Sequence, residues 1–209
     1  MKRIILIGAS GHGKVCAEIA SLNGYAKILF LDDNRELKTC GNYKVVGTTD
    51  NLYENIDEQT EFFVSIGNAN YRKPIQEKIE KAGGKIATLI HPNAVVSSDV
   101  TLGVGSVVMA GAVINAGTKI GKGVIVNTSS SIDHDCNVGD YCHIAVGAHV
   151  CGTVNIGEMT WIGAGATISN NLEICQKCTI GAGATVIRDI EDEVTVVGNP
   201  AKVIKRHTV

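Results

Sequence analysis

Histidine and cysteine, the side chains best suited to proton transfer, nucleophilic attack and metal binding, gather between residues 129 and 152. This stretch holds three of the six histidines and three of the seven cysteines, namely His134, His143, His149, Cys136, Cys142 and Cys151. Their spacing lacks the paired Cys-x-x-Cys units that are typical of zinc-thiolate sites. Whether they bind a metal, catalyse a reaction or fill space depends on which way each side chain points.

A six-residue repeat sets those directions. From Val96 to Val186, every sixth residue is valine, leucine or isoleucine, and the residue two positions earlier is small in most repeats. This pattern predicts a hexapeptide β-helix, in which three short sides make one triangular coil and the aliphatic residue fills its interior. We expect the prism to cover about residues 94–188.

The register of this repeat separates the cysteines from the histidines. Cys136, Cys142 and Cys178 occupy the small inward positions, so we expect them to be core residues with inert thiols. The three histidines of the stretch project outward. Since His143 and His149 fall on successive sides of one coil, they cannot share a metal within one chain, and we expect no metal site.

The first 90 residues follow a different pattern. A short apolar run, RIILI, precedes the glycine-rich turn GASGHGK, and a helix with Val15, Ile19 and Leu22 on its apolar face follows. Further strands and a second helix alternate up to about residue 90, which predicts a parallel sheet of Rossmann type. The expected fold is therefore an α/β Rossmann-like N-terminal domain, 1–90, followed by an all-β left-handed parallel β-helix domain, 91–209.

Composition and net charge limit the kinds of partner and the cellular compartment that we expect. The net charge of −2 gives no reason to expect nucleic acid or a membrane surface as a partner. The apolar runs are too short for a signal peptide or a membrane-spanning helix, so we expect no membrane insertion. An odd number of cysteines without disulfide-framework spacing is typical of reduced thiols in the cytoplasm.

The glycine-rich turn predicts ligand binding at the N-terminal sheet. Its glycines are ordered G-x-x-G-x-G, whereas a dinucleotide fingerprint reads G-x-G-x-x-G, which argues against NAD. Its backbone N–H groups can still receive phosphate oxygens at the start of the helix, although His12 could instead cap that helix. Asp32 and Asp33 end the second strand, where a carboxylate can accept from ribose hydroxyls, although LDDN is also a good solvated turn.

The stretches GASGHGKV, FLDD, SIGN, NTSSSIDHDC and VVGNPAKVIK together resemble those of nucleotide-sugar acetyltransferases. These enzymes join a Rossmann-like domain to a left-handed β-helix. The resemblance is strongest to the UDP-4-amino-sugar N-acetyltransferases of bacillosamine synthesis, and the sialic acid O-acetyltransferases share the layout. It covers essentially the whole chain, and it implies a homotrimer with active sites between adjacent prisms and acetyl-CoA as co-substrate.

The resemblance also implies a role for particular residues. His134 matches the general base, and Asp135 matches an acidic neighbour that is usually a glutamate and is credited with raising that base's proton affinity. Because aspartate is one methylene shorter, the sequence leaves open whether it reaches the histidine. The positions implied to contact acetyl-CoA are His143, Gly152, Ala164 and Ala182, and those implied to hold the nucleotide sugar are Ser10, Gly11, His12, Asp32, Asp33 and Gly67.

The predicted reaction is direct acetyl transfer from acetyl-CoA to the 4-amino group of a nucleotide-linked sugar, with UDP as the expected nucleotide. Three alternatives stay open at this point. The acceptor could be a hydroxyl of a sialic acid or another sugar, the prism could be a metal-dependent hydratase, or it could be a trimeric scaffold without chemistry.

Overall fold

The computed structural model describes residues 2–191 and 193–207. The chain divides into two compact units, Met1–Pro92 and Asn93–Val209, so the division falls two residues beyond the boundary expected from the sequence.

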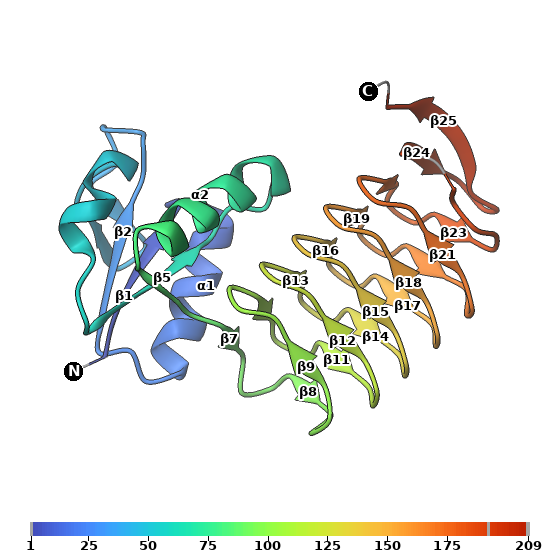
Figure 1. The fold of residues 1–209 in the computed structure, drawn as a ribbon, viewed down its shortest axis with the longest axis horizontal. Helices are drawn as coiled ribbons and strands as arrows, with labels where there is room; N and C mark the ends of the chain where they lie inside the picture. Colours follow the sequence, from blue (N-terminus) through green and yellow to red (C-terminus); the bar gives the residue numbers. More distant parts are fainter. Residues whose placement is uncertain (1, 192, 208–209) are drawn as a thin grey trace. The chain divides into compact units, whose positions relative to one another are not determined.

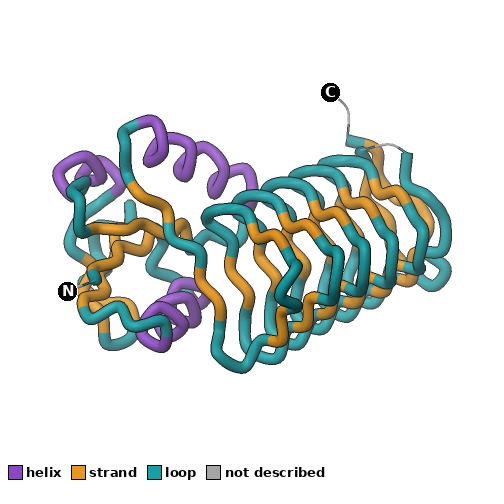
Figure 2. The backbone as a smooth tube through the Cα atoms, turned by 60° about the horizontal axis from the view of Figure 1, so that its bottom comes forward, coloured by secondary structure: helices purple, strands orange, loops and turns teal. Residues whose placement is uncertain are grey.

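The first unit is a parallel sheet with one helix on each face (Figure 2). Its strands are ordered β3-β4-β2-β1-β5-β6, and every pair is parallel except the β3–β4 hairpin. The elements are β1 (Arg3–Ile7), α1 (Gly11–Leu22), β2 (Lys27–Leu31), β3 (Thr39–Cys40), β4 (Tyr43–Val45), the 3-10 helix η1 (Thr49–Asn55), β5 (Thr60–Val64), α2 (Ala69–Lys81), β6 (Lys85–Ile86) and β7 (Leu89–Ile90). The central strand β1 is buried on both faces, which explains its unbroken apolar run.

The buried face of α1 differs from the expected one. The helix buries small residues, Cys16, Ala17 and Ala20, together with Ile19, while Val15 and Leu22 are exposed. Close approach of helix and sheet explains the choice, because a Cβ at Gly13 would lie 2.3 Å from the carbonyl oxygen of Gly8. A helix this close to the sheet has room for small side chains on its inner face.

The second unit is a left-handed parallel β-helix, and this confirms the fold expected from the repeat (Figures 1 and 2). Its three sheets are ordered β25-β24-β22-β19-β16-β13-β10, β23-β20-β17-β14-β11-β8 and β21-β18-β15-β12-β9. The two-residue strands are β8 (Val95–Val96), β9 (Thr101–Leu102), β10 (Val107–Val108), β11 (Val113–Ile114), β12 (Lys119–Ile120), β13 (Ile125–Val126), β14 (Ser131–Ile132), β15 (Asn137–Val138), β16 (His143–Ile144), β17 (His149–Val150), β18 (Asn155–Ile156), β19 (Trp161–Ile162), β20 (Thr167–Ile168), β21 (Glu173–Ile174), β22 (Thr179–Ile180) and β23 (Thr185–Val186). A hairpin of β24 (Val194–Val197) and β25 (Lys202–Arg206) follows.

The second residue of each strand points into the prism, as the repeat predicts. Val108, Ile120, Ile132, Ile144, Ile156 and Ile168 are all buried in one apolar cluster. Cys136, Cys142 and Cys178 belong to the same cluster, so the expectation that they fill the core is confirmed. The first residue of each strand points outward and stacks on the residue 18 positions later, as Ser131 does on His149.

From Gly105 to Gly183, each corner of the prism bends through one residue with a left-handed backbone, three positions after the inward aliphatic residue. Glycine holds this position in many coils, for example Gly117, since it adopts a positive φ without steric cost. Other coils place a larger residue there, and Asp135 is one of them, with a φ of 57°. The repeat therefore imposes the backbone conformation of Asp135 whatever side chain it carries.

Candidate active site

In the first unit, three loops gather at the carboxyl ends of the adjacent parallel strands β2, β1 and β5. The Ser65 hydroxyl donates to the carbonyl oxygens of Ile7 and Gly8, at 3.0 and 2.8 Å, and so ties the turn after β5 to the glycine-rich turn after β1. Gly67 lies in the turn after β5, and its carbonyl oxygen accepts from Arg72 at 2.6 Å. This edge is where an open α/β sheet binds its ligands.

The start of α1 is open toward that edge. Ser10 is the N-cap residue, but its side chain makes no capping hydrogen bond, and both Ser10 and Gly11 are exposed. The first N–H groups of a helix have no partner within the helix, and together with the helix dipole they favour an anion such as a phosphate. The turn therefore has the geometry of a phosphate site.

His12 is partly buried behind this turn. Its Nε2 lies 3.6 Å from the thiol sulfur of Cys16, one helical turn later. Burial, and secondly the positive charge of Arg72, lowers the pKa of His12 to about 4. His12 is therefore a neutral imidazole at physiological pH, able to donate or accept a hydrogen bond without carrying charge.

The two aspartates after β2 already hold backbone groups. The carboxylate of Asp32 accepts from Ala9 N at 2.7 Å and from Asn34 N at 2.9 Å, which joins its loop to the glycine-rich turn. Asp33 accepts from the backbone N–H and the hydroxyl of Thr49, at 2.9 and 2.7 Å. A ligand would use the lone pairs that these bonds leave available.

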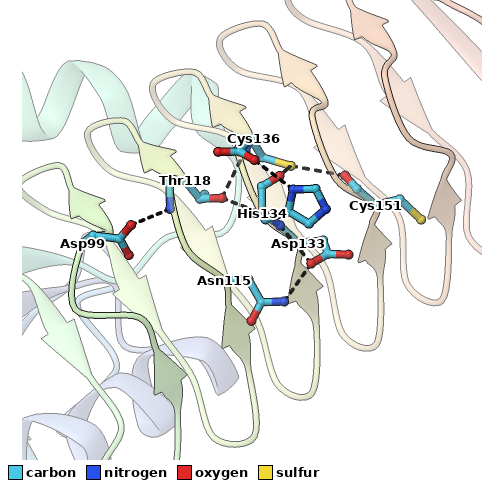
Figure 3. Close-up of polar contacts among 9 residues, drawn as sticks. Asp99, Asn115, Thr118, Asp133, His134, Cys136 and Cys151 are labelled. Carbon is cyan, nitrogen blue, oxygen red and sulfur yellow. Dashed lines mark hydrogen bonds and ion pairs between the residues drawn. The ribbon is translucent and has the colours of Figure 1, made fainter.

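In the second unit, His134 stands at the prism corner that follows β14, with its ring in the open (Figure 3). Its Nδ1 lies 2.9 Å from the Asp135 carboxylate, so the shorter acidic side chain does reach the ring. An Nδ1–H that donates to Asp135 leaves the lone pair on Nε2 available to accept a proton. The pair can therefore act as a base through Nε2.

Hydrogen bonds from the preceding coil hold the backbone beneath this ring. Asp133 accepts from His134 N at 2.9 Å and from the Asn115 side chain at 2.8 Å, and its own carbonyl oxygen accepts from the Thr118 hydroxyl at 2.7 Å (Figure 3). The hydrogen bond to Asp135, followed by the charge of Asp133, raises the pKa of His134 above its ordinary value. The two carboxylates thus make His134 a stronger base.

Two glycines make room for the His134–Asp135 pair. A Cβ at Gly152, one coil later, would lie 2.6 Å from His134 Nε2, and a Cβ at Gly117, one coil earlier, would lie 2.4 Å from an Asp135 carboxylate oxygen. Real Cβ atoms do not approach other atoms this closely. Gly152 therefore belongs beside the reactive nitrogen of His134, which the residues alone did not show.

His143 lies on the outward side of β16, as the repeat predicts, and its side chain is nevertheless buried. Trp161, its neighbour one coil later, stacks on its ring at 5.0 Å between centroids, with an interplanar angle of 28°. The Asn127 side-chain nitrogen lies 3.0 Å from His143 Nε2. His149 remains exposed, and its Nδ1 pairs with the Ser131 hydroxyl at 2.8 Å.

Ala164 and Ala182 lie in a second column, at the corner that follows the sheet containing His143. Both are exposed small residues 18 positions apart, so they occupy the same corner in successive coils. Across the part of the chain that the structure describes, no three His, Cys, Asp or Glu side chains gather in a way that could hold a metal ion. Within the same residues, no helix is long and apolar enough to cross a membrane.

Sequence reasoning missed Asn115, Thr118 and Asn127, which support the two histidines from neighbouring coils. The signal was present for Asn115, since it precedes Asp133 by 18 residues and so must stack on it. Asn127 is harder to find, because its side chain crosses to a residue 16 positions later, out of step with the stack.

Comparison with known protein families gives one match in each of the two units. Residues 3–79 match the model of the PglD N-terminal domain, and residues 153–188 match that of the bacterial transferase hexapeptide in six repeats. Fold and family models together define a hexapeptide-repeat transferase with a PglD-type N-terminal domain.

Proteins similar to this chain identify the kind of transferase more closely than the family models do. The acetyltransferase domain of PglB from Neisseria gonorrhoeae FA1090, in complex with acetyl coenzyme A, is 44% identical, with a TM-score of 0.94 over 97% of this chain and 99% of that one. PerB from Caulobacter crescentus, in complex with CoA and GDP-perosamine, is 34% identical, with a TM-score of 0.92 over 97% of each chain. UDP-N-acetylbacillosamine N-acetyltransferase from Bacillus subtilis (strain 168) is 34% identical over 113 residues, which are 53% of this chain and about half, 52%, of that protein. The chain belongs to the family of nucleotide-sugar acetyltransferases.

Proposed function

We propose that the chain transfers the acetyl group of acetyl-CoA to the 4-amino group of a nucleotide-linked amino sugar, with UDP as the expected nucleotide. The observation that carries this proposal is the His134–Asp135 pair, an exposed imidazole whose Nδ1 is held by a carboxylate and whose Nε2 lies beside a glycine. The relatives that bind CoA and act on amino sugars support the substrate class.

The proposed mechanism is direct transfer. The neutral amine attacks the thioester carbon, and His134 Nε2 takes the proton that the amine loses as the C–N bond forms. The tetrahedral intermediate then collapses, the C–S bond breaks, and the imidazolium returns the proton to the departing thiolate. Asp135 stabilises the imidazolium between these steps, and Cys136 takes no part because its thiol is buried in the prism.

The remaining site residues divide between the two substrates. In the proposal, Ser10, Gly11 and Gly67 receive the diphosphate at the edge of the sheet, His12 gives a neutral hydrogen bond, and Asp32 and Asp33 contact the nucleoside. In the same proposal, acetyl-CoA contacts His143 and Gly152 and runs along the prism past Ala164 and Ala182. These assignments rest on the geometry of each unit and on the resemblance to the family.

The test of this function is release of free thiol from acetyl-CoA in the presence of UDP-, GDP- and CMP-linked sugars. We expect thiol release with a 4-amino sugar and a product heavier by one acetyl group, found by mass spectrometry. Transfer only to hydroxylated sugars without an amine would replace the N-acetyltransferase by an O-acetyltransferase. Thiol release with none of the sugars tested would contradict the proposal.

Asp135→Asn should separate the charge of Asp135 from its hydrogen bond. Asparagine can still accept from Nδ1–H, so the ring keeps its orientation, but without the carboxylate the pKa of His134 falls toward its ordinary value. Since the neutral imidazole is the active form, the acid limb of the profile of kcat/KM against pH should move to lower pH. The weaker base should also lower kcat by roughly tenfold. An unchanged acid limb would show that Asp135 does not set the basicity of His134.

We further propose that the chain is a cytoplasmic homotrimer. In the structure, the exposed large aliphatic residues of the prism include Val95, Val104, Val146 and Ile187. Apolar residues left on a prism surface are suited to contact with another copy. Light scattering should give three times the chain mass of 22.0 kDa, and a monomer at micromolar concentration would exclude the trimer. Seven cysteines without disulfide-framework spacing support a reducing compartment.

A further inference from the structure

His143 and Asn127 form a hydrogen-bonded pair whose polarity can be derived from the backbone. The N–H of Thr128 lies 2.8 Å from the Asn127 side-chain oxygen, and a backbone N–H can only donate. The atom of Asn127 that faces Thr128 must therefore be its oxygen. This fixes the orientation of the amide without reference to the histidine.

The opposite end of the same amide then sets the state of the imidazole. With the oxygen turned to Thr128, the Asn127 nitrogen faces His143 Nε2 at 3.0 Å, and an amide nitrogen can only donate. His143 Nε2 must therefore accept, so the proton of the neutral ring is on Nδ1. A protonated Nε2 would set two N–H donors against each other.

Packing holds the ring in this position. His143 is 8% exposed, and Trp161 stacks on it. Hydrogen bonds are electrostatically stronger in such surroundings than in water, and a mismatched pair of donors is correspondingly costly. Both histidines therefore carry the proton of the neutral ring on Nδ1, but Asp135 engages Nδ1 of His134 whereas Asn127 engages Nε2 of His143.

We infer that Asn127 is a positioning residue that makes His143 a neutral hydrogen-bond donor, through Nδ1, to a carbonyl oxygen of acetyl-CoA. The inference rests on the proposed function for the identity of the ligand, but the tautomer follows from this chain alone. Acetyl-CoA offers two kinds of carbonyl, the amides of its pantetheine arm and the thioester. Donation to an amide would hold the substrate, whereas donation to the thioester oxygen would stabilise the oxyanion that forms there.

Asn127→Asp tests the assignment with little change in shape. A carboxylate accepts at both oxygens, so it can keep the bond from Thr128 but can face His143 only if Nε2 carries a proton. Nitrogen-15 NMR of the histidine-labelled full-length protein, with His143→Gln to assign the signals, should show Nδ1–H in the unsubstituted chain and a protonated Nε2 in the variant. Asn127→Ala should give a mixture of tautomers. Asn137→Asp, on an exposed face of the prism, is the matched control and should leave the His143 signals in place.

Steady-state kinetics should show which carbonyl of acetyl-CoA accepts the hydrogen bond from His143. In Asn127→Asp, a KM for acetyl-CoA raised about tenfold at unchanged kcat assigns the bond to a pantetheine amide, and a kcat lowered by that factor assigns it to the thioester. The KM for the nucleotide sugar should not change. The inference is overturned if His143 carries its proton on Nε2 in the unsubstituted chain, or if the Asp variant leaves both the tautomer and the acetyl-CoA kinetics unchanged. A chain with the predicted tautomer but without acetyl transfer would refute the proposed function alone.

Discussion

His134→Ala should lower kcat by about 10²- to 10⁴-fold, the contribution of a positioned general base. The loss should fall on kcat, because His134 is proposed to act on the reacting amine, whereas the nucleotide is proposed to bind at the N-terminal sheet. The measurement is steady-state thiol release at saturating concentrations of both substrates, together with the affinity for the nucleotide sugar measured by calorimetry. That affinity should stay close to its original value.

Two variants serve as controls for this prediction. His149→Ala removes another exposed histidine of the prism, whose Nδ1 pairs with the Ser131 hydroxyl, and it should leave kcat near its original value. Cys136→Ser changes a core thiol two residues from His134, and it should lower stability slightly with little effect on chemistry. If Cys136→Ser abolished turnover while His134→Ala retained it, transfer would proceed through a covalent thiol intermediate and the mechanism proposed here would be wrong.

Ile144→Asp should prevent the β-helix from folding. Ile144 is fully buried among aliphatic side chains of the prism, and an unpaired charge placed there costs several kcal/mol, a large share of the stability of an ordinary domain. Circular dichroism should show loss of the β-helix signal or a much lower Tm.

The matched control is Ile144→Val, which removes one methylene and should cost about 0.5–1.5 kcal/mol in the free energy of unfolding. Urea titration of both variants gives the comparison. A Tm for Ile144→Asp equal to that of the unsubstituted chain would mean that residue 144 does not face the interior, and the register of the repeat would have to be shifted.

The repeat made the prism predictable. A period of six leaves one register in which every inward position is aliphatic, so the burial of Ile132 or Ile168 follows from counting. The N-terminal helix offered no such constraint. Val15 and Leu22 were assigned to its inner face by hydrophobicity, but how closely α1 approaches the sheet is set at Gly8 and Gly13, and at that distance small residues fit better.

The part of the site that could be predicted from the sequence is the part in which residues stack on those 18 positions away in the next coil. His134 and Asp135 were found by type and position, and adding 18 to a residue number finds the neighbours Asn115–Asp133 and His143–Trp161. The burial of His143 was not predictable, because an outward position says nothing about what covers it. Nor was the contact with Asn127, since it depends on a side-chain rotamer and not on the repeat.

The left-handed backbone at Asp135 means that the residue proposed to favour activity is not the residue that would favour stability at this position. The corner requires a positive φ, at which glycine has no penalty and an ordinary residue costs about 1–2 kcal/mol, less for aspartate because its side chain tolerates this conformation. Gly117, one coil earlier, shows the relaxed alternative. Selection of variants for thermal stability alone would therefore favour glycine at position 135. The most stable variants would then lack the carboxylate that pairs with His134.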